Sequence, residues 1–212
     1  MKKLEIGPNL ELGKISSEWD TMNIIGNCTI KWDLRNLPLP IPDGTYDLVY
    51  LSHVLEHIEW RKTVNILREI KRILKPNGRV EIWVPDMDKL IEGYLHPENI
   101  SKDTLIWRYN PNKEPTLWFN ARMFSLTDGY KDEENLHRAC FNKELLIKRL
   151  TQAGFERIKI LNRKPLGYDH GWINLGIEGY KKIKHKLSID PNIGNIIQAT
   201  PYIEHWRIYE VP

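Results

Sequence analysis

The chain has 212 residues, of which 41% are hydrophobic and 28% charged, and its formal net charge is +3. This composition suits one soluble globular domain. The net charge is too small to indicate a nucleic-acid partner. No apolar run approaches the roughly 20 residues that a membrane-spanning helix needs. Two cysteines, Cys28 and Cys140, are too few for a disulfide framework. Residues 1–6 enter a strand-like segment that leaves no room for a signal peptide. We therefore expect a cytoplasmic protein that binds no membrane.

The first part of the chain predicts three short strands. A strand over residues 3–6 ends at Gly7-Pro8-Asn9, which is a turn signal. Apolar or β-branched runs at 22–25 and 28–32 predict two further strands. Asp33 ends the last of them, so Gly7 and Asp33 each follow a predicted strand directly.

The best-defined unit is a strand, a helix and a second strand. Residues 46–52 form the near-continuous apolar run of a strand buried in a parallel sheet. From His53 to Leu74 apolar residues recur at spacings of three and four, which predicts a helix. Lys75-Pro76-Asn77-Gly78 signals its end, and residues 79–84 predict the next strand. This order indicates an α/β fold with a right-handed crossover.

The second half of the chain is less regular. Residues 95–136 are rich in Pro, Asn, Asp and aromatic residues and lack clear periodicity, which predicts a lid or binding loop. A helix then begins after the N-cap Asn142 and ends at Gly154. Strands are expected at 155–161 and 172–177.

The segment from Tyr46 to Asp86 resembles the central part of the class I S-adenosylmethionine-dependent methyltransferases. The pieces that match are Leu55-Glu56-His57, Leu74-Lys75-Pro76-Asn77-Gly78 and Val84-Pro85-Asp86 at the centre, and Leu4-Glu5-Ile6-Gly7, Trp32-Asp33-Leu34, Leu37-Pro38, His137-Arg138, Phe141, Leu145 and Ala153-Gly154-Phe155 in the flanks.

The resemblance implies a Rossmann-like methyltransferase fold. We expect a mostly parallel central sheet of about seven strands, flanked by helices, with a lid-like insertion after the fifth strand. The methyltransferase domain would span residues 1–180, with the insertion at about 95–136. Residues 181–212 would form a C-terminal extension packed on the same domain.

The resemblance also implies a site for S-adenosylmethionine. Ligands of open α/β sheets bind beyond the carboxyl ends of the strands, where several candidates lie. The expected cofactor-binding residues are Gly7, Pro8, Asn9, Asn23, Asp33, Leu34, Ser52 and His53. Asp33 would accept a hydrogen bond from the adenine amino group, and Leu34 would lie beneath the ring.

Two positions depart from the family pattern. Pro8-Asn9 stands where a second glycine is usual, and Asn23 stands where an acidic residue usually binds the ribose. An amide lacks the charge that roughly doubles the strength of such a hydrogen bond. These departures motivate a second hypothesis, a non-catalytic methyltransferase-like binding module with a degenerate cofactor loop.

Three histidines are the candidate catalytic residues. Methyl transfer needs alignment and exclusion of water, and a base helps when the acceptor is a hydroxyl. His53 and His57 are expected on one face of a helix, with His137 across the cleft. The acceptor is expected to be a small molecule or glycan, because the chain lacks the Pro-Pro-aromatic motif of base-amino methyltransferases and a Pro-Cys nucleophile. Four aromatic residues could stack on it or pin the loop to the core: Trp107, Tyr109, Trp118 and Phe119.

Other classes remain as alternatives. His53 to His57 fits the HxxEH pattern of inverted zinc peptidases, but those carry it within a long helix. Some methyltransferases that resemble this chain hold a divalent ion with an ExxEH motif and a later histidine; Glu56, His57 and His137 match, and nitrogen-rich ligands would favour a zinc-like ion. We assign no metal site from sequence. A dehydrogenase is disfavoured because GxGxxG is absent, and we expect a monomer or homodimer.

Overall fold

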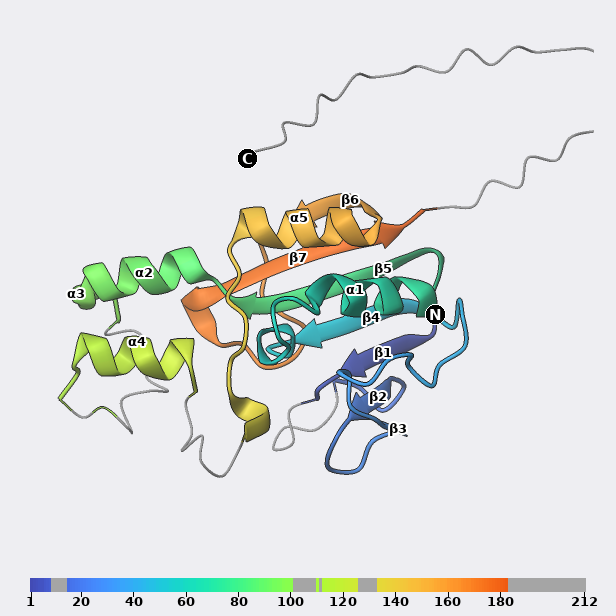
Figure 1. The fold of residues 1–212 in the computed structure, drawn as a ribbon, viewed down its shortest axis with the longest axis horizontal. Helices are drawn as coiled ribbons and strands as arrows, with labels where there is room; N and C mark the ends of the chain where they lie inside the picture. The colour runs from blue at the N-terminus through green and yellow to red at the C-terminus, as the bar shows by residue number, and fades with distance from the viewer. Residues whose placement is uncertain (9–14, 101–109, 111, 126–132, 183–212) are drawn as a thin grey trace, which may run out of the picture.

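The computed structural model describes residues 1–8, 15–100, 110, 112–125 and 133–182. Their strands form one sheet with the order β3-β2-β1-β4-β5-β7-β6 (Figure 1). The strands are β1 (Lys3–Ile6), β2 (Asp20–Asn23), β3 (Ile30–Lys31), β4 (Tyr46–Ser52), β5 (Leu74–Pro85), β6 (Phe155–Ile160) and β7 (Asn174–Lys181). Neighbours from β3 to β5 are parallel, whereas β7 is antiparallel to both β5 and β6. The predicted seven-stranded, mostly parallel Rossmann-like sheet is confirmed.

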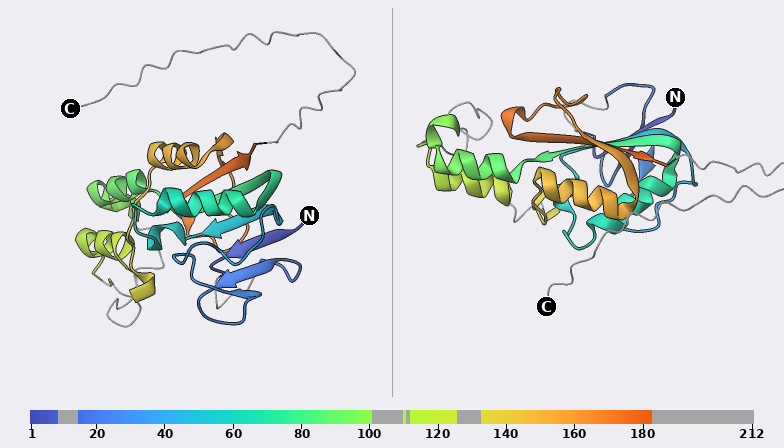
Figure 2. Two further views of the ribbon diagram at one scale, coloured as in Figure 1. Left: turned by 45° about the vertical axis from the view of Figure 1, so that its right-hand side comes forward. Right: turned by 90° about the horizontal axis from the view of Figure 1, so that it is seen from above.

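Two helices cover one face of this sheet. α1 (Thr63–Ile73) and α5 (Lys143–Ala153) contact each other and lie on the same side (Figure 2). The apolar residues of α1 recur at helical spacing, so Ile66, Leu67 and Ile70 are fully buried against the sheet. The predicted ends of α5 are confirmed: Asn142 accepts a hydrogen bond from the Leu145 amide, and Gly154 is left-handed.

The opposite face carries a smaller aromatic cluster. Trp19, Leu48, Tyr50 and Trp83 are buried there, and Ile15 and Leu161 pack against them. Among the described residues this face is therefore covered by connecting segments, and both covering helices, α1 and α5, lie on the other side.

A second core lies beyond the carboxyl ends of β4 and β5. α2 (Met87–Leu95), α3 (Pro97–Ile100) and α4 (Pro115–Met123) gather there, at the left of Figure 1, around Trp118. The prediction of an irregular stretch over 95–136 is therefore wrong for α3 and α4. Trp118 is fully buried and stacks on Trp172, with ring centroids 6.1 Å apart, so it packs in this core.

The other aromatic candidates divide between two groups. Phe119 is partly buried against the second core and its ring lies 5.3 Å from that of Tyr94. Trp107 and Tyr109 lie outside the described residues, as do 126–132 and most of the predicted extension at 181–212. None of the described helices has the length and apolarity that would let it cross a bilayer.

The predicted helix from His53 is also corrected. His53 has a φ of +54°, the 3-10 helix η1 spans only Leu55–His57, and α1 begins at Thr63. Leu55 and Ile58 are buried because this turn folds back onto the core. Two buried apolar residues three positions apart look like one face of a helix in the sequence, although no α-helix forms here. The long helix that an HxxEH peptidase needs is therefore absent from this segment.

Several strands depart from their predicted bounds, and β5 begins at Leu74 instead of residue 79. β2 begins two residues before the expected 22–25, and β7 begins at Asn174 because the 3-10 helix η3 occupies Gly171–Ile173. The third strand shortens to Ile30–Lys31.

Candidate active site

A cleft opens at the point where the strand order of the sheet reverses. β1 pairs with β2 on one side and with β4 on the other, and parallel α/β sheets bind ligands outside such a point. The cleft has a volume of about 250 Å³ and is open to solvent on one side. It is lined by Ile6, Gly7, Pro8, Met22, Asn23, Ile24, Ile25, Trp32, Asp33, Leu34, Arg35, His53, Val54, His57, Ile58, Glu134 and Asn135.

Gly7 forms the tight turn at the end of β1. Its φ is +69°, a region that L side chains rarely adopt. A Cβ at this position would lie 2.4 Å from Cγ2 of Val54, so only glycine fits. The turn thereby brings the backbone of Gly7 and Pro8 to the edge of the cleft.

Asp33 places a carboxylate in the cleft beyond β3. Arg35 holds it, because its backbone amide donates to Oδ1 at 2.8 Å and its guanidinium lies 2.8 Å from Oδ2. Burial works to raise the pKa of Asp33, but the hydrogen bonds and charge of Arg35 outweigh it and lower the pKa. Asp33 is therefore an oriented anion.

Asn23 is the last residue of β2 and ties the strand to the glycine turn. Its Oδ1 accepts a hydrogen bond from the Ile24 amide at 2.8 Å, and its Nδ2 lies 3.5 Å from the Pro8 carbonyl oxygen. The amide thus has local partners as well as a place in the cleft lining.

His53 follows β4 and is held on three sides. Nδ1 lies 3.1 Å from Oε1 of Glu56, and Nε2 lies 2.9 Å from Oδ1 of Asn174. The amide of Asn174 is itself oriented by a 2.8 Å hydrogen bond to Asp169. The ring of His170 stacks on that of His53 at 3.6 Å. Both nitrogens of His53 therefore face oxygen atoms of the protein.

Two histidines of this region are kept neutral near pH 7. Burial, followed by repulsion from His53, lowers the pKa of His170 to about 3. Burial also lowers the pKa of His137, against the attraction of Glu56.

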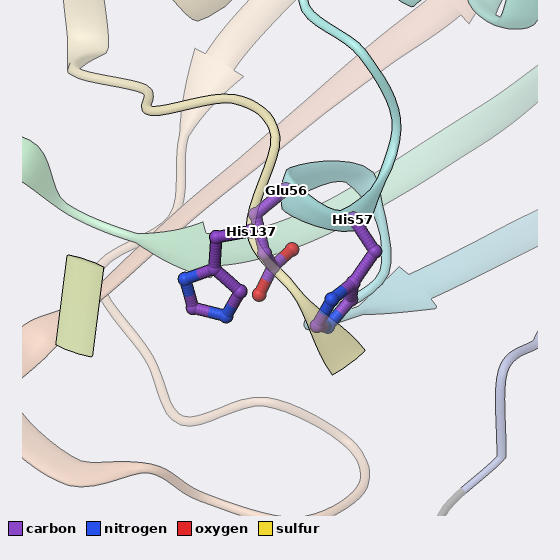
Figure 3. A group of neighbouring side chains, drawn as sticks. All are labelled: Glu56, His57 and His137. Atoms are coloured by element: carbon purple, nitrogen blue, oxygen red, sulfur yellow. The ribbon is translucent and has the colours of Figure 1, made fainter. Parts of the chain in front are cut away.

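Glu56 lies between the rings of His57 and His137 (Figure 3). Its side chain is 1% exposed, and neither carboxylate oxygen has a well-aligned hydrogen bond among the described residues. Burial works to raise the pKa of Glu56, but the contact with His53 and the nearby charge of His57 lower it to about 2. Glu56 is therefore a buried, ionised carboxylate next to His53 and His57, two residues that line the cleft.

The structure gathers most of the residues expected from sequence. Gly7, Pro8, Asn23, Asp33, Leu34, His53 and His57 line the cleft, and the His137 ring lies 4.9 Å from that of His57. Ser52 is not among the lining residues, and its side chain hydrogen-bonds to Tyr50. Asn9 lies outside the described residues.

Sequence reasoning missed several members of the site. Arg35 is signalled only by its nearness to Asp33, and Glu134 and Asn135 line the cleft from the 3-10 helix η2 (Glu133–Asn135). His170 and Asn174 lie more than 110 residues from His53 along the chain and carry no local signal.

Comparison with known proteins gives a consistent result. A family model described as a methyltransferase domain matches residues 18–82. An uncharacterized methyltransferase of Schizosaccharomyces pombe is 29% identical over 149 residues, which cover 66% of this chain and 51% of that protein. An O-methyltransferase of Stereocaulon alpinum is 26% identical over 123 residues, which cover 58% of this chain and 35% of that protein. The chain spans about half or less of the length of the curated relatives that it matches.

A solved structure shares the architecture. The crystal structure of a SAM-dependent methyltransferase from Archaeoglobus fulgidus superposes with a TM-score of 0.52 at 16% identity and covers 85% of this chain and 86% of that one. Its fold, the matched domain model and the glycine turn beside the switch-point cleft agree. The chain is therefore similar in residues 18–82 to methyltransferase domains, and its described residues have the class I, Rossmann-like fold of S-adenosylmethionine-dependent methyltransferases.

Proposed function

We propose that this protein transfers a methyl group from S-adenosylmethionine to a hydroxyl of a small-molecule or glycan acceptor. The observation that carries the proposal is that the cleft for the cofactor and a group of acid–base side chains share one residue, His57. The cleft beyond β1 and β4 is bordered by His57, which lies beside the buried Glu56 and the partly buried His137. The similarity to an O-methyltransferase of Stereocaulon alpinum supports a hydroxyl acceptor.

The residues of the cleft fit the cofactor. An adenosyl group has an apolar ring with polar edges, and the cleft pairs apolar side chains such as Leu34 and Ile24 with the oriented carboxylate of Asp33. Asn23 and the backbone of the Gly7 turn add polar groups. The cofactor supplies an activated methyl group, so the protein has to orient the acceptor, exclude water and receive a proton.

His57 is suited to the acceptor side. Its Nδ1 donates a hydrogen bond to the Leu136 carbonyl at 3.3 Å, which leaves the lone pair of Nε2 free. In His53, by contrast, both nitrogens face protein oxygens. We therefore assign His53 a positioning role, in which it holds the side chains of Glu56 and Asn174 in place. The neutral ring of His137 packs edge-on against the ring of His57, with the ring centroids 4.9 Å apart.

A non-catalytic binding module is the second candidate. One observation favours it: the Asn23 amide replaces the usual acid and already has local partners in Ile24 and Pro8. Cofactor affinity separates the two candidates, because a degenerate site would not hold S-adenosylhomocysteine.

Replacement of Asp33 by alanine should weaken binding of S-adenosylhomocysteine about 10- to 100-fold, because a hydrogen bond to a charged group contributes roughly 1.5–3 kcal/mol. Isothermal titration calorimetry of the full chain measures this change. Asp43→Ala is the matched control, since Asp43 is an exposed aspartate paired with Arg72 and is not among the residues that line the cleft. Equal affinity of Asp33→Ala and wild type would contradict the assignment of Asp33. Absence of binding to folded wild type would favour the binding module.

Replacement of His57 by glutamine should lower the turnover number at least about 100-fold, which is the usual contribution of a positioned acid–base group. Affinity for S-adenosylhomocysteine should stay within about threefold, because glutamine keeps a polar side chain of similar reach. Release of S-adenosylhomocysteine is followed with a panel of small phenols and monosaccharides. His96→Gln, at an exposed histidine beside Glu98, is the control. Full turnover by His57→Gln would remove His57 from the mechanism.

A further inference from the structure

We propose that Glu134 binds the ribose hydroxyls of the adenosyl group, and that it reaches them from η2 rather than from a strand of the sheet. The cleft is lined by residues at the ends of β1, β2 and β3, and also by Glu134 and Asn135 of η2. η2, drawn in yellow in Figure 1, lies beyond the ends of β1 and β4. The assignment rests on the proposed function, because it assumes that an adenosyl group binds in this cleft.

The backbone that carries η2 is fixed to η1. The amides of Arg138 and Ala139 both donate to the carbonyl oxygen of Glu56, at 2.7 and 3.0 Å. The guanidinium of Arg138 donates to the backbone oxygens of His57 and Glu133, at 3.3 and 3.0 Å. A side chain on a backbone held in this way is placed before the ligand arrives, so less entropy is lost on binding.

Glu134 is the carboxylate of the cleft that has oxygens available. Among the described residues that line the cleft, the carboxylates are those of Asp33 and Glu134. Asp33 accepts hydrogen bonds from the backbone amide and from the guanidinium of Arg35. Within the described part of the chain, the Glu134 carboxylate forms no hydrogen bond or salt bridge. A ligand hydroxyl that donates to a carboxylate therefore finds its acceptor in Glu134.

The chemistry of a ribose suits such a carboxylate. Its two hydroxyls are neighbours and each can donate a proton, whereas an ionised carboxylate has two accepting oxygens and no donor. Hydrogen bonds to a charged acceptor are roughly twice as strong as neutral ones. Asn23, at the end of β2, offers a neutral amide, and its Oδ1 already accepts from the Ile24 amide at 2.8 Å. Glu134 is therefore the stronger acceptor for the ribose.

The electrostatic contact with Arg35 indicates which part of the ligand Glu134 meets. The carboxylate of Asp33, and then the more distant charge of Glu134, raise the pKa of the Arg35 guanidinium. Glu134 thus lies close enough to the pair of Asp33 and Arg35 to act on it through space. Because Asp33 is the residue that we expect at the adenine, this position favours the ribose over the amino-acid part of the cofactor as the partner of Glu134.

Isothermal titration calorimetry of the full chain with three ligands tests the assignment. We expect Glu134→Gln to weaken binding of S-adenosylhomocysteine and of adenosine about 10-fold each, because the amide loses the charge assistance. The same variant should bind 2′,3′-dideoxyadenosine as wild type does, because this probe lacks both hydroxyls. Glu133→Gln is the matched control, since Glu133 belongs to the same η2, lies 3.8 Å from Arg138 and does not line the cleft. Its affinities should equal those of wild type.

A second variant separates loss of charge from distortion of η2. Asn23→Asp in the Glu134→Gln background returns a carboxylate to the cleft from β2, without any change in η2. We expect the double variant to recover most of the affinity for adenosine that Glu134→Gln loses. Its affinity for 2′,3′-dideoxyadenosine should stay at the wild-type value.

The outcomes distinguish this assignment from the proposed function. Equal adenosine affinity of Glu134→Gln and wild type would overturn the assignment, as would an equal loss for 2′,3′-dideoxyadenosine. A loss confined to S-adenosylhomocysteine would also overturn it, because Glu134 would then bind the amino-acid part. In either case binding of S-adenosylhomocysteine by wild type would leave the proposed function intact. Adenosine binding that depends on Glu134, in protein that does not bind S-adenosylhomocysteine, would keep the assignment and reject methyl transfer.

Discussion

Replacement of Gly7 by alanine is expected to abolish binding of S-adenosylhomocysteine, with an affinity at least about 100-fold below that of wild type. An L side chain at a φ of +69° costs roughly 1–2 kcal/mol. The new Cβ would also lie 2.4 Å from Cγ2 of Val54, a β-branched side chain with little rotamer freedom. The turn has to move, and the backbone edge of the cleft moves with it.

Calorimetric titration and chemical denaturation measure the two effects. Gly44→Ala is the matched control, because Gly44 has a φ of +64° but its added Cβ would meet nothing closer than 4.0 Å. The free energy of unfolding of Gly44→Ala should fall by only about 1 kcal/mol, from the strained backbone conformation, and its cofactor affinity should equal that of wild type. Cofactor binding by Gly7→Ala within threefold of wild type would show that the turn does not hold the ligand.

Replacement of Gly176 by alanine should cause the largest loss of stability, about 3 kcal/mol or more. Gly176 of β7 lies opposite Trp83 of β5, and an added Cβ would lie 2.4 Å from two atoms of the indole ring. The ring is 2% exposed and its Nε1 donates to Oε1 of the buried Glu81 at 2.8 Å. Displacing it both overpacks the sheet face and leaves Glu81 without that donor.

Thermal unfolding checks this result, and a chain of this size should melt roughly 10 °C lower. Gly167→Ala is the control on the same face, because the nearest atom to its added Cβ would be at 3.6 Å, an ordinary contact. A fall of less than about 3 °C in Gly176→Ala would contradict the packing that we describe.

The parts of the fold that sequence predicts well are those fixed by local patterns. β1 and β4 have the expected bounds, because a run of apolar residues between turn signals leaves few alternatives. α5 has its expected ends because a capping asparagine and a left-handed glycine act within a few residues.

The predictions from sequence fail where contacts between distant parts of the chain determine the local structure. The residues after His53 mimic a helix because a 3-10 turn buries Leu55 and Ile58 at the same spacing. α4 escaped detection because only Trp118 and Arg122 of its residues are buried, so its apolar face is narrow. The start of β7 was misplaced because η3 uses apolar residues that read as strand.

The candidate site divides in the same way. Gly7, Asp33 and His53 were predictable together, because parallel strands end at one edge of a sheet. Asn174, His170 and the Leu136 carbonyl were not, because each reaches the site from a segment about 80 residues or more away. These groups orient the imidazole rings of His53 and His57, and the sequence alone does not show how those rings are oriented.

The position of β7 between β5 and β6 delays completion of the sheet during synthesis. A chain emerging from the ribosome presents β5 and then β6, but the strand that joins them, Asn174–Lys181, emerges last of the three. Until then the outer edge of β5 and the edge of β6 have unpaired backbone groups, which can pair with another nascent chain. When β7 emerges, it pairs with both strands and leaves β6 as the edge of the sheet on this side.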